Sequence, residues 1–275
     1  MDGTDAREAW TMIVALQGGL ANQLFQYAFG RSVSIAKGEE LFFKNQFGGA
    51  PHCKYGLDDL HTKIQFGGPP PTYLYSEGAF KYDTNVYNAP HGTFYNGFWQ
   101  TEKYFNEPIV REEIRMKTPM SPEGMKWAEK IASAETSCSV HIRRGDYLKE
   151  PHKSFHGVLD LEYYRRALEC VEHQMQYLGR VEFFIFSDDL NWCQNTFKGG
   201  FEFVDHGNAY ESLFLMKLCH HAIIANSSYS WWGAWLGDEQ KEDRLVIAPE
   251  KWFSDSSGMQ YGDVVPERWV KIPNA

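Results

Sequence analysis

The segment Val181–Phe186 reads VEFFIF, and Ser187, Asp188 and Asp189 follow it directly. An apolar run of this kind, almost without interruption, is typical of a parallel strand that is covered on both faces. The segment before it carries apolar residues with the spacing of one core-facing helix side: Leu161, Tyr164, Leu168, Val171, Met175 and Leu178. Short helical and strand-like segments then alternate up to residue 248. We therefore predict an α/β domain of Rossmann type, whose ligand lies beyond the carboxyl ends of its strands.

The N-terminal half begins with the same kind of unit. Met12–Leu16 (MIVAL) predicts a buried strand, and Gly18 and Gly19 predict a turn. Helical spacing starts at Asn22, a residue type able to cap a helix. The chain thus opens with strand, turn and helix.

The division of the chain is less sharply marked. Residues 1–11 form a polar leader, and residues 45–100 show no clear period, so we expect loops with short strands there. Residues 118–122 (TPMSP) break the chain again. We predict two Rossmann-like domains, at residues 12–130 and 131–275.

The composition excludes several classes of protein. The 275 residues carry 27 basic and 36 acidic side chains, a net charge of −9, which disfavours a nucleic-acid binder. Five cysteines without a C-x-x-C pair disfavour a disulfide framework and a structural zinc site. The start resembles no signal peptide and no apolar run is long enough to cross a membrane. We expect a cytoplasmic protein and leave open its association with the inner face of the membrane.

The sharpest candidate site is the segment HIRRGDY, residues 141–147. It ends a predicted strand and enters a loop, where two arginines are costly unless they meet anions or solvent. The planar guanidinium groups of Arg143 and Arg144 suit phosphate oxygens, and Asp146 can orient an arginine. The structural alternative is an ion pair between Arg144 and Asp146.

Three other segments lie at predicted strand ends. The segment at residues 16–23 contains a glycine turn that feeds a helix N-terminus and can hold an anion, or it is only a tight turn. Asp188 can accept hydrogen bonds from guanine, or it caps a helix as Asp189 is expected to do. The hydroxyls of Ser227 and Ser228 can line a phosphate.

Together these segments resemble the alpha-1,2-fucosyltransferases of glycosyltransferase family 11. The motifs that carry the resemblance, in family order, are GGLANQLFQYAFGR (18–31), GFWQTEKYF (97–105), HIRRGDY (141–147), FSDD (186–189) and NSSYSWWGAWL (226–236). In one place the chain departs from the family pattern, because Ala21 stands where the family usually has glycine. A position that needed a positive φ would be strained by alanine, and donor affinity would suffer.

The resemblance implies a GT-B-like fold, with two Rossmann-type domains facing a cleft and the donor GDP-fucose on the C-terminal domain. It places Arg143 on the pyrophosphate and makes Arg143 and Asp146 the catalytic candidates. It also implies a set of donor-binding residues: Gly19, Leu20, Ala21, Asn22, His141, Arg143, Arg144, Asp188, Ser227 and Ser228.

The resemblance further implies a reaction. L-Fucose moves from GDP to the 2-hydroxyl of a terminal β-galactoside in a glycan, with inversion and without a metal or other cofactor. The acceptor candidates are Gln23, Gln100 and Glu102. The residues alone leave the base open between Asp146, Glu150, Glu102 and no strong base.

Two other classes stay open on the sequence alone. A non-catalytic glycan- or nucleotide-binding protein of the same fold fits the abundant aromatic residues, 9 Trp, 15 Tyr and 19 Phe. A Rossmann oxidoreductase is disfavoured because the first glycine turn lacks the G-x-G-x-x-G pattern.

Overall fold

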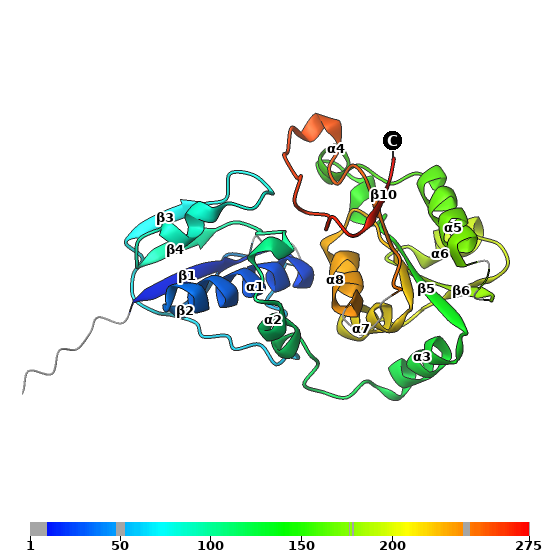
Figure 1. Cartoon of the computed structure of the whole chain (residues 1–275), viewed down its shortest axis with the longest axis horizontal. Coiled ribbons are helices and arrows are strands. Elements are labelled where there is room, and N and C mark those ends of the chain that lie inside the picture. The colour runs from blue at the N-terminus through cyan, green and yellow to red at the C-terminus, as the bar shows by residue number, and fades with distance from the viewer. Residues whose placement is uncertain (1–9, 48–52, 176, 178, 239–242, 275) are drawn as a thin grey trace, which may run out of the picture. The chain divides into compact units, whose positions relative to one another are not determined.

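The computed structural model describes residues 10–47, 53–175, 177, 179–238 and 243–274. The chain forms two compact units (Figure 1). The first extends to Lys117 and includes Gln260–Val264, and the second spans Thr118–Met259 and resumes at Val265. The predicted boundary at residue 130 is wrong, because α3 (Pro122–Ser133) packs on α7 (Ala209–Leu218) of the second unit. Residues 1–9 of the predicted leader lie outside the described residues, and Thr11 already belongs to a strand.

The first unit is built on a parallel sheet of order β2-β1-β4-β3. Its strands are β1 (Thr11–Leu16), β2 (Glu40–Asn45), β3 (Tyr73–Ser76) and β4 (Thr93–Asn96). Helix α1 (Leu20–Lys37) joins β1 to β2 and packs on β1. Shorter elements follow: η1 (Thr84–Asn88), η2 (Glu102–Tyr104) and α2 (Glu107–Glu113).

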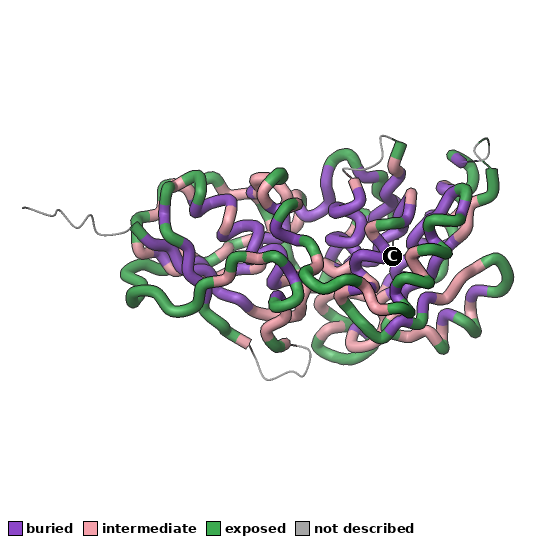
Figure 2. Tube along the Cα trace, turned by 90° about the horizontal axis from the view of Figure 1, so that it is seen from below, coloured by how far each residue is buried: buried purple, intermediate pink, exposed green. Residues whose placement is uncertain are grey.

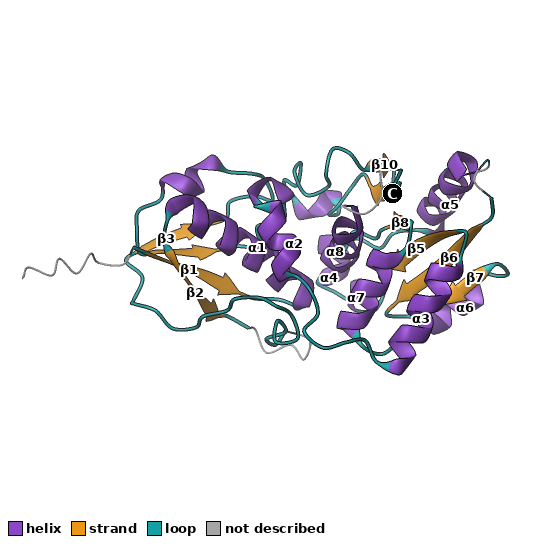
Figure 3. Ribbon diagram, turned by 60° about the horizontal axis from the view of Figure 1, so that its bottom comes forward, coloured by secondary structure: helices purple, strands orange, loops and turns teal. Residues whose placement is uncertain are grey.

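The second unit holds a parallel sheet of order β10-β9-β8-β5-β6-β7. Its strands are β5 (Thr136–Ile142), β6 (Val181–Ser187), β7 (Phe201–Phe203), β8 (His221–Ile223), β9 (Val246–Pro249) and β10 (Val270–Ile272). The helices not yet named are η3 (Asp146–Leu148), α4 (His152–His156), α5 (Leu161–Met175), α6 (Leu190–Thr196), α8 (Ser228–Gly237) and η5 (Asp255–Ser257). Helices α5 and α6 lie on one face of the sheet, and α3, α7 and α8 lie on the other (Figure 3).

The strands at the centre of the second sheet are buried, and Figure 2 shows the buried residues of each unit in purple. All seven residues of β5 are buried, as are the central four of β6. Alternate β5 residues Cys138, Val140 and Ile142 share one cluster with Tyr163 and Tyr164 of α5. The apolar run at residues 181–186, in β6, therefore has the cause predicted from the sequence, because helices cover both faces of this sheet.

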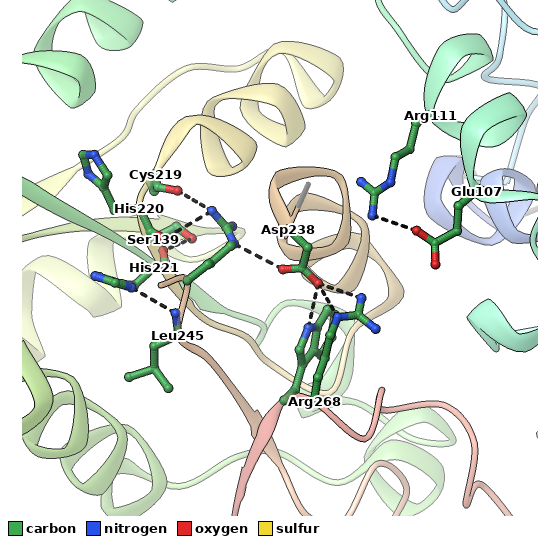
Figure 4. Close-up of polar contacts among 11 residues, drawn as sticks. Glu107, Arg111, Ser139, Cys219, His220, His221, Asp238, Leu245 and Arg268 are labelled. Atoms are coloured by element: carbon green, nitrogen blue, oxygen red, sulfur yellow. Dashed lines mark hydrogen bonds and ion pairs between the residues drawn. The ribbon is translucent and has the colours of Figure 1, made fainter. Parts of the chain in front are cut away.

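A buried polar cluster closes the side of the second unit where α8 ends (Figure 4). Asp238 accepts hydrogen bonds from Arg268 Nη2 (2.7 Å) and Trp269 Nε1 (2.9 Å), and lies 3.4 Å from Arg244 Nε. Arg244 is almost fully buried and donates to the carbonyl oxygens of Cys219 and His220. Burial lowers the pKa of Arg244, and the Asp238 carboxylate opposes that shift. The C-terminal segment is thus tied to the end of α8.

Both sheets reverse their strand order at the first strand of the unit. In the first unit the order reverses between β1 and β4, and in the second between β5 and β8. In open parallel sheets, ligands bind beyond the carboxyl ends of the strands at such a switch point. The residues after β1, β4, β5 and β8 therefore define the candidate sites. Among the described residues, no helix is long and apolar enough to cross a membrane.

Candidate active site

Arg143 lies directly after β5, at the switch point of the second unit. One terminal nitrogen is 2.5 Å from Asp146 Oδ1 and the other is 2.8 Å from Asp188 Oδ2. The guanidinium carbon lies 5.2 Å from the centre of the Tyr147 ring, and the side chain is 29% exposed. Arg143 donates a hydrogen bond to Asp146 and forms an ion pair with Asp188, and an arginine has five N–H donors, so others remain for an anionic ligand. Arg143 is thus oriented before any ligand arrives.

Arg144 points to a different partner. Its Nε lies 3.3 Å from Asp189 Oδ2, and its guanidinium stacks over Trp192 at 3.7 Å from the ring centre. The alternative ion pair between Arg144 and Asp146 is therefore wrong, because Asp146 binds Arg143 instead. Asp189 also caps α6, as predicted, by accepting from the backbone N–H of Trp192.

Asp188 connects the two arginines. Its Oδ1 accepts from the backbone N–H of Arg144 at 2.9 Å, and its Oδ2 pairs with Arg143. A Cβ on Gly145 would lie 2.4 Å from that Oδ2, so the loop requires glycine there for the close approach. Asp188 therefore fixes the loop of residues 143–146 that follows β5, which we call the arginine loop. Its contact with guanine stays a prediction.

His141 is buried in β5 below this loop. Its Nδ1 has no hydrogen-bond partner among the described atoms, and its ring lies 5.6 Å from that of Tyr229. Burial, with the charge of Arg143, lowers the pKa of His141 to about 3. The ring is therefore neutral at ordinary pH and provides a nitrogen at the base of the loop.

The turn after β8 faces the same switch point. Ser227 caps α8 by accepting from the backbone N–H of Tyr229, and Ser228 is the first residue of the helix. Asn226 is 3% exposed, and its side-chain amide donates to the backbone carbonyl oxygen of His156. The backbone carbonyl oxygen of Asn226 accepts from the hydroxyl of Tyr147. The structure thus brings the predicted phosphate-lining serines and the arginine loop to neighbouring strand ends.

In the first unit, the predicted anion-binding turn lies between β1 and α1. Gly19 is the N-cap residue, and Leu20, Ala21 and Asn22 form the first helical turn. The predicted capping by Asn22 is wrong, since its Oδ1 instead accepts from Gln100 Nε2 at 2.9 Å. Ala21 is buried in this turn and has no positive φ. Alanine therefore fits this position without backbone strain.

The three acceptor candidates have different surroundings. Gln23 is fully buried; its Nε2 donates to the carbonyls of Gly18 and Lys54, and its Oε1 accepts from the Gly56 N–H. The amide of Gln23 is therefore used inside the unit, and its acceptor role stays a prediction. Gln100 is 7% exposed beside Asn22, and Glu102 is partly exposed at the start of η2.

The strand ends of the first unit also contain residues that the sequence reasoning missed. Gln17 follows β1, and its side chain donates to the Gly97 carbonyl at 3.3 Å. Glu77 follows β3 and binds the backbone of residues 98 and 99. The only signal for Glu77 was an acidic residue after the short segment YLYS, in a region without a period.

Asp146 and Glu150, two of the candidate bases, are engaged with other groups. Asp146 orients Arg143, and Glu150 accepts from the backbone and hydroxyl of Ser154. Among the described residues, no group of three His, Cys, Asp or Glu side chains could hold a metal ion. The metal-independent reaction stays a prediction.

The architecture and several known proteins define the class. The chain is similar to a solved structure of an Arabidopsis thaliana FUT1 mutant in complex with GDP, with a TM-score of 0.52 and 10% identity. The match covers 92% of this chain and 73% of the FUT1 chain. A family model described as "Glycosyl transferase family 11" matches residues 75–273. The chain is a glycosyltransferase with a GT-B-like fold, and the predicted pair of Rossmann-type domains is confirmed. More narrowly, it belongs to glycosyltransferase family 11.

Relatives of known name support the same conclusion. The chain is 31% identical to an Escherichia coli alpha-1,2-colitosyltransferase over 95% of its own length and 98% of the relative's. It is 39% identical to the E. coli O-antigen biosynthesis glycosyltransferase WbnK in a match that covers 52% of this chain and 46% of WbnK. It is 22% identical to the mouse galactoside 2-alpha-L-fucosyltransferase Sec1 over 81% of its length and 63% of that protein.

Proposed function

We propose that this enzyme transfers L-fucose from GDP-fucose to the 2-hydroxyl of a terminal β-galactoside in a glycan, with inversion and without a metal. The single observation that carries the proposal is Arg143, held between Asp146 and Asp188 at the switch point of the second unit. The names of the relatives support transfer of a deoxyhexose through an alpha-1,2 linkage.

The leaving group sets the main chemical demand. The acceptor oxygen bonds to the anomeric carbon while the bond from that carbon to the phosphate oxygen breaks, and GDP takes the electron pair. Preorganised donors aimed at developing charge are a large source of transition-state stabilisation. Arg143, together with the N–H groups after β8, is suited to neutralise the diphosphate, and the acceptor proton passes to a carboxylate or to water.

The donor sugar needs a direct comparison. Colitose is L-fucose without the 3-hydroxyl, so the two GDP-sugars share the diphosphate that Arg143 would bind. A site built to hydrogen-bond a hydroxyl discriminates strongly against the analogue that lacks it. We favour GDP-fucose, and GDP-colitose is the competing donor in the test.

The test is incubation with each GDP-sugar and with lactose or N-acetyllactosamine, in the presence of a chelator. We expect GDP release and a product whose mass is increased by one fucosyl residue, with the new linkage at the 2-hydroxyl of galactose. Product from GDP-colitose alone would overturn the donor assignment. Activity that returned only on addition of a divalent metal would overturn the metal-independent mechanism.

Arg143→Ala tests the site itself. We expect a loss of at least about 100-fold in kcat/KM, because a donor aimed at developing charge is removed. Arg165→Ala is the matched control, since Arg165 is an exposed arginine of α5 paired with Glu162 and Glu169. Parent-like turnover by a folded Arg143→Ala enzyme would contradict the assignment.

A further inference from the structure

Glu77 is a carboxylate at the carboxyl end of β3 whose two oxygens each bind the backbone of a neighbouring segment. Oε2 accepts from the N–H of Phe98 at 2.6 Å, and Oε1 accepts from the N–H of Trp99 at 3.1 Å. Gly97 allows this approach, because a Cβ there would lie 2.5 Å from the Glu77 Cβ. Glu77 therefore binds the start of the segment 97–105 from outside that segment.

The backbone that Glu77 binds is strained. Trp99 has φ of +57°, and it is the one residue other than glycine with a positive φ among those that the structure describes. A bulky residue persists in this conformation only where its surroundings hold it. The indole is 1% exposed and stacks on Phe29 with ring centres 4.1 Å apart, while Glu77 binds its N–H. Packing and the carboxylate together hold the turn.

The strained turn leads directly to the polar residues of the segment. Gln100 follows Trp99 and donates to Asn22 Oδ1 in the first turn of α1. The N–H of Thr101 bonds back to the Trp99 carbonyl at 2.8 Å. The orientation of Gln100 and its contact with α1 therefore depend on the conformation of Trp99.

We propose that ionised Glu77 is a positioning residue that holds the Phe98–Trp99 turn and thereby orients Gln100 and the segment 97–105 for the acceptor. This inference rests on the proposed function and on the expectation that the acceptor candidates Gln100 and Glu102, which belong to the first unit, contact the acceptor. Glu77 acts through the backbone it binds, and no direct proton transfer to the acceptor is assigned to it.

The ionisation of Glu77 gives the proposal a distinctive signature. Burial raises the pKa of Glu77 to about 7, while the two backbone N–H groups oppose the shift. The nearby titratable groups are Tyr104, whose pKa is itself raised by burial, and Tyr75, which donates to Asp83. No ion pair of Glu77 is found among the described residues. Protonation of Glu77 would turn one of its two carboxylate oxygens into an O–H donor, which would face the N–H group of Phe98 or Trp99 instead of accepting from it.

The test compares Glu77→Gln with the parent and with Glu40→Gln, a control at an exposed glutamate of the same unit. We expect Glu77→Gln to lower kcat/KM for the acceptor about 10- to 100-fold at about pH 8, from the loss of a charge-assisted hydrogen bond. Donor affinity, measured by calorimetry with GDP, should stay within about threefold of the parent, because Glu77 binds the backbone of Phe98 and Trp99 and, among the described residues, none of the donor-binding candidates directly. The acid fall in activity of the parent near pH 7 should be absent from the variant.

Stability and amide exchange separate this role from simple unfolding. Burial raises the pKa of Glu77 from 4.5 to about 7, so the folded state favours the protonated carboxyl. The free energy of unfolding that this preference contributes is fully present below pH 4.5 and is lost as the pH rises through 7. Glu77→Gln should therefore melt no lower than the parent at about pH 8. The amides of residues 97–101 should exchange faster in the variant, and this measurement needs no substrate, so it tests Glu77 even if the proposed donor or acceptor is wrong.

Three results would overturn the proposal. The first is unchanged amide exchange in residues 97–101. The second is acceptor kcat/KM within about threefold of the parent with the same acid fall in activity. The third is a loss of kcat beyond about 1,000-fold with unchanged acceptor KM, which would make Glu77 the base itself and not a positioning residue.

Discussion

Arg143 and Asp188 form an ion pair of 2.8 Å that joins the loop after β5 to the loop after β6. The two residues are 45 positions apart, but their strands pair in parallel, with Ile142 opposite Ser187. The carboxyl ends of parallel neighbours lie at the same edge of a sheet, so residues that follow them meet there. Asp188 therefore sets the direction of Arg143 as well as its charge balance.

Replacement of Asp188 by asparagine should disturb Arg143 without unfolding the enzyme. The amide keeps the shape but not the charge, and its NH₂ group would face a donor. We expect a fall of about 10- to 100-fold in kcat/KM for the donor, from the loss of a charge-assisted hydrogen bond worth about 1.5–3 kcal/mol. Asp255→Asn is the control, because that carboxylate is exposed and pairs with Lys251. A donor kcat/KM equal to that of the control would contradict the role.

Ala21→Gly tests whether the departure from the family pattern weakens donor binding. Ala21 is in the first turn of α1 without a positive φ, so glycine relieves no strain there. We expect GDP affinity within about threefold of the parent and a loss of about 0.5–1 kcal/mol in unfolding free energy, the usual cost of glycine in a helix. A tenfold gain in affinity would show that the methyl group hinders the ligand.

Much of the fold could be predicted because its signals are local. The apolar run at 181–186, the helix spacing at 161–175 and the glycine turn at 18–19 each define an element without knowledge of the rest. The positions of Arg143 and Asp188 followed from the rule for parallel strands.

The remainder depends on contacts between distant residues. Gln23 belongs to the predicted anion-binding turn segment, and only tertiary structure shows that its amide is bound by residues 54 and 56. Glu77 lies where the sequence has no period, and its partners at 98 and 99 come from another strand end. The boundary at residue 118 depends on the packing of α3 against α7, which no local pattern reports.

Gln23→Ala should impair folding stability and leave acceptor binding unchanged. The substitution leaves the Gly18 and Lys54 carbonyls and the Gly56 N–H without their buried partner. Because an unsatisfied buried polar group costs about 1–3 kcal/mol, we expect at least about 2 kcal/mol less unfolding free energy by urea titration. Gln65→Ala is the control, since its side-chain bond to Glu40 is exposed. A raised acceptor KM with parent stability would instead support the predicted acceptor role of Gln23.

His156 should contribute to loss of stability in acid. Its ring stacks on Tyr147 with centres 4.4 Å apart, and burial, with the charge of His152, lowers its pKa from 6.5 to about 4. Because the folded state favours the neutral ring, the free energy of unfolding that this preference contributes is present above pH 6.5 and is lost as the pH falls through 4. His156→Phe keeps the stack, so its melting temperature should fall less over this range than that of the parent. His173→Phe, at an exposed position of α5, should follow the parent. An identical fall in the His156 variant and the parent would contradict this contribution.

Asp238→Ala should be the most destabilising of the substitutions considered, although it lies away from the arginine loop. It removes the only carboxylate paired with the buried Arg244 among the described residues, together with the acceptor for Trp269 Nε1. Breaking a buried ion pair by removing one partner costs about 3–5 kcal/mol, because an uncompensated charge remains. Arg268→Ala removes the exposed partner of the same carboxylate and should cost about 1 kcal/mol or less. Urea unfolding of both variants distinguishes these values, and equal losses would mean that Arg244 does not depend on Asp238 for its charge balance.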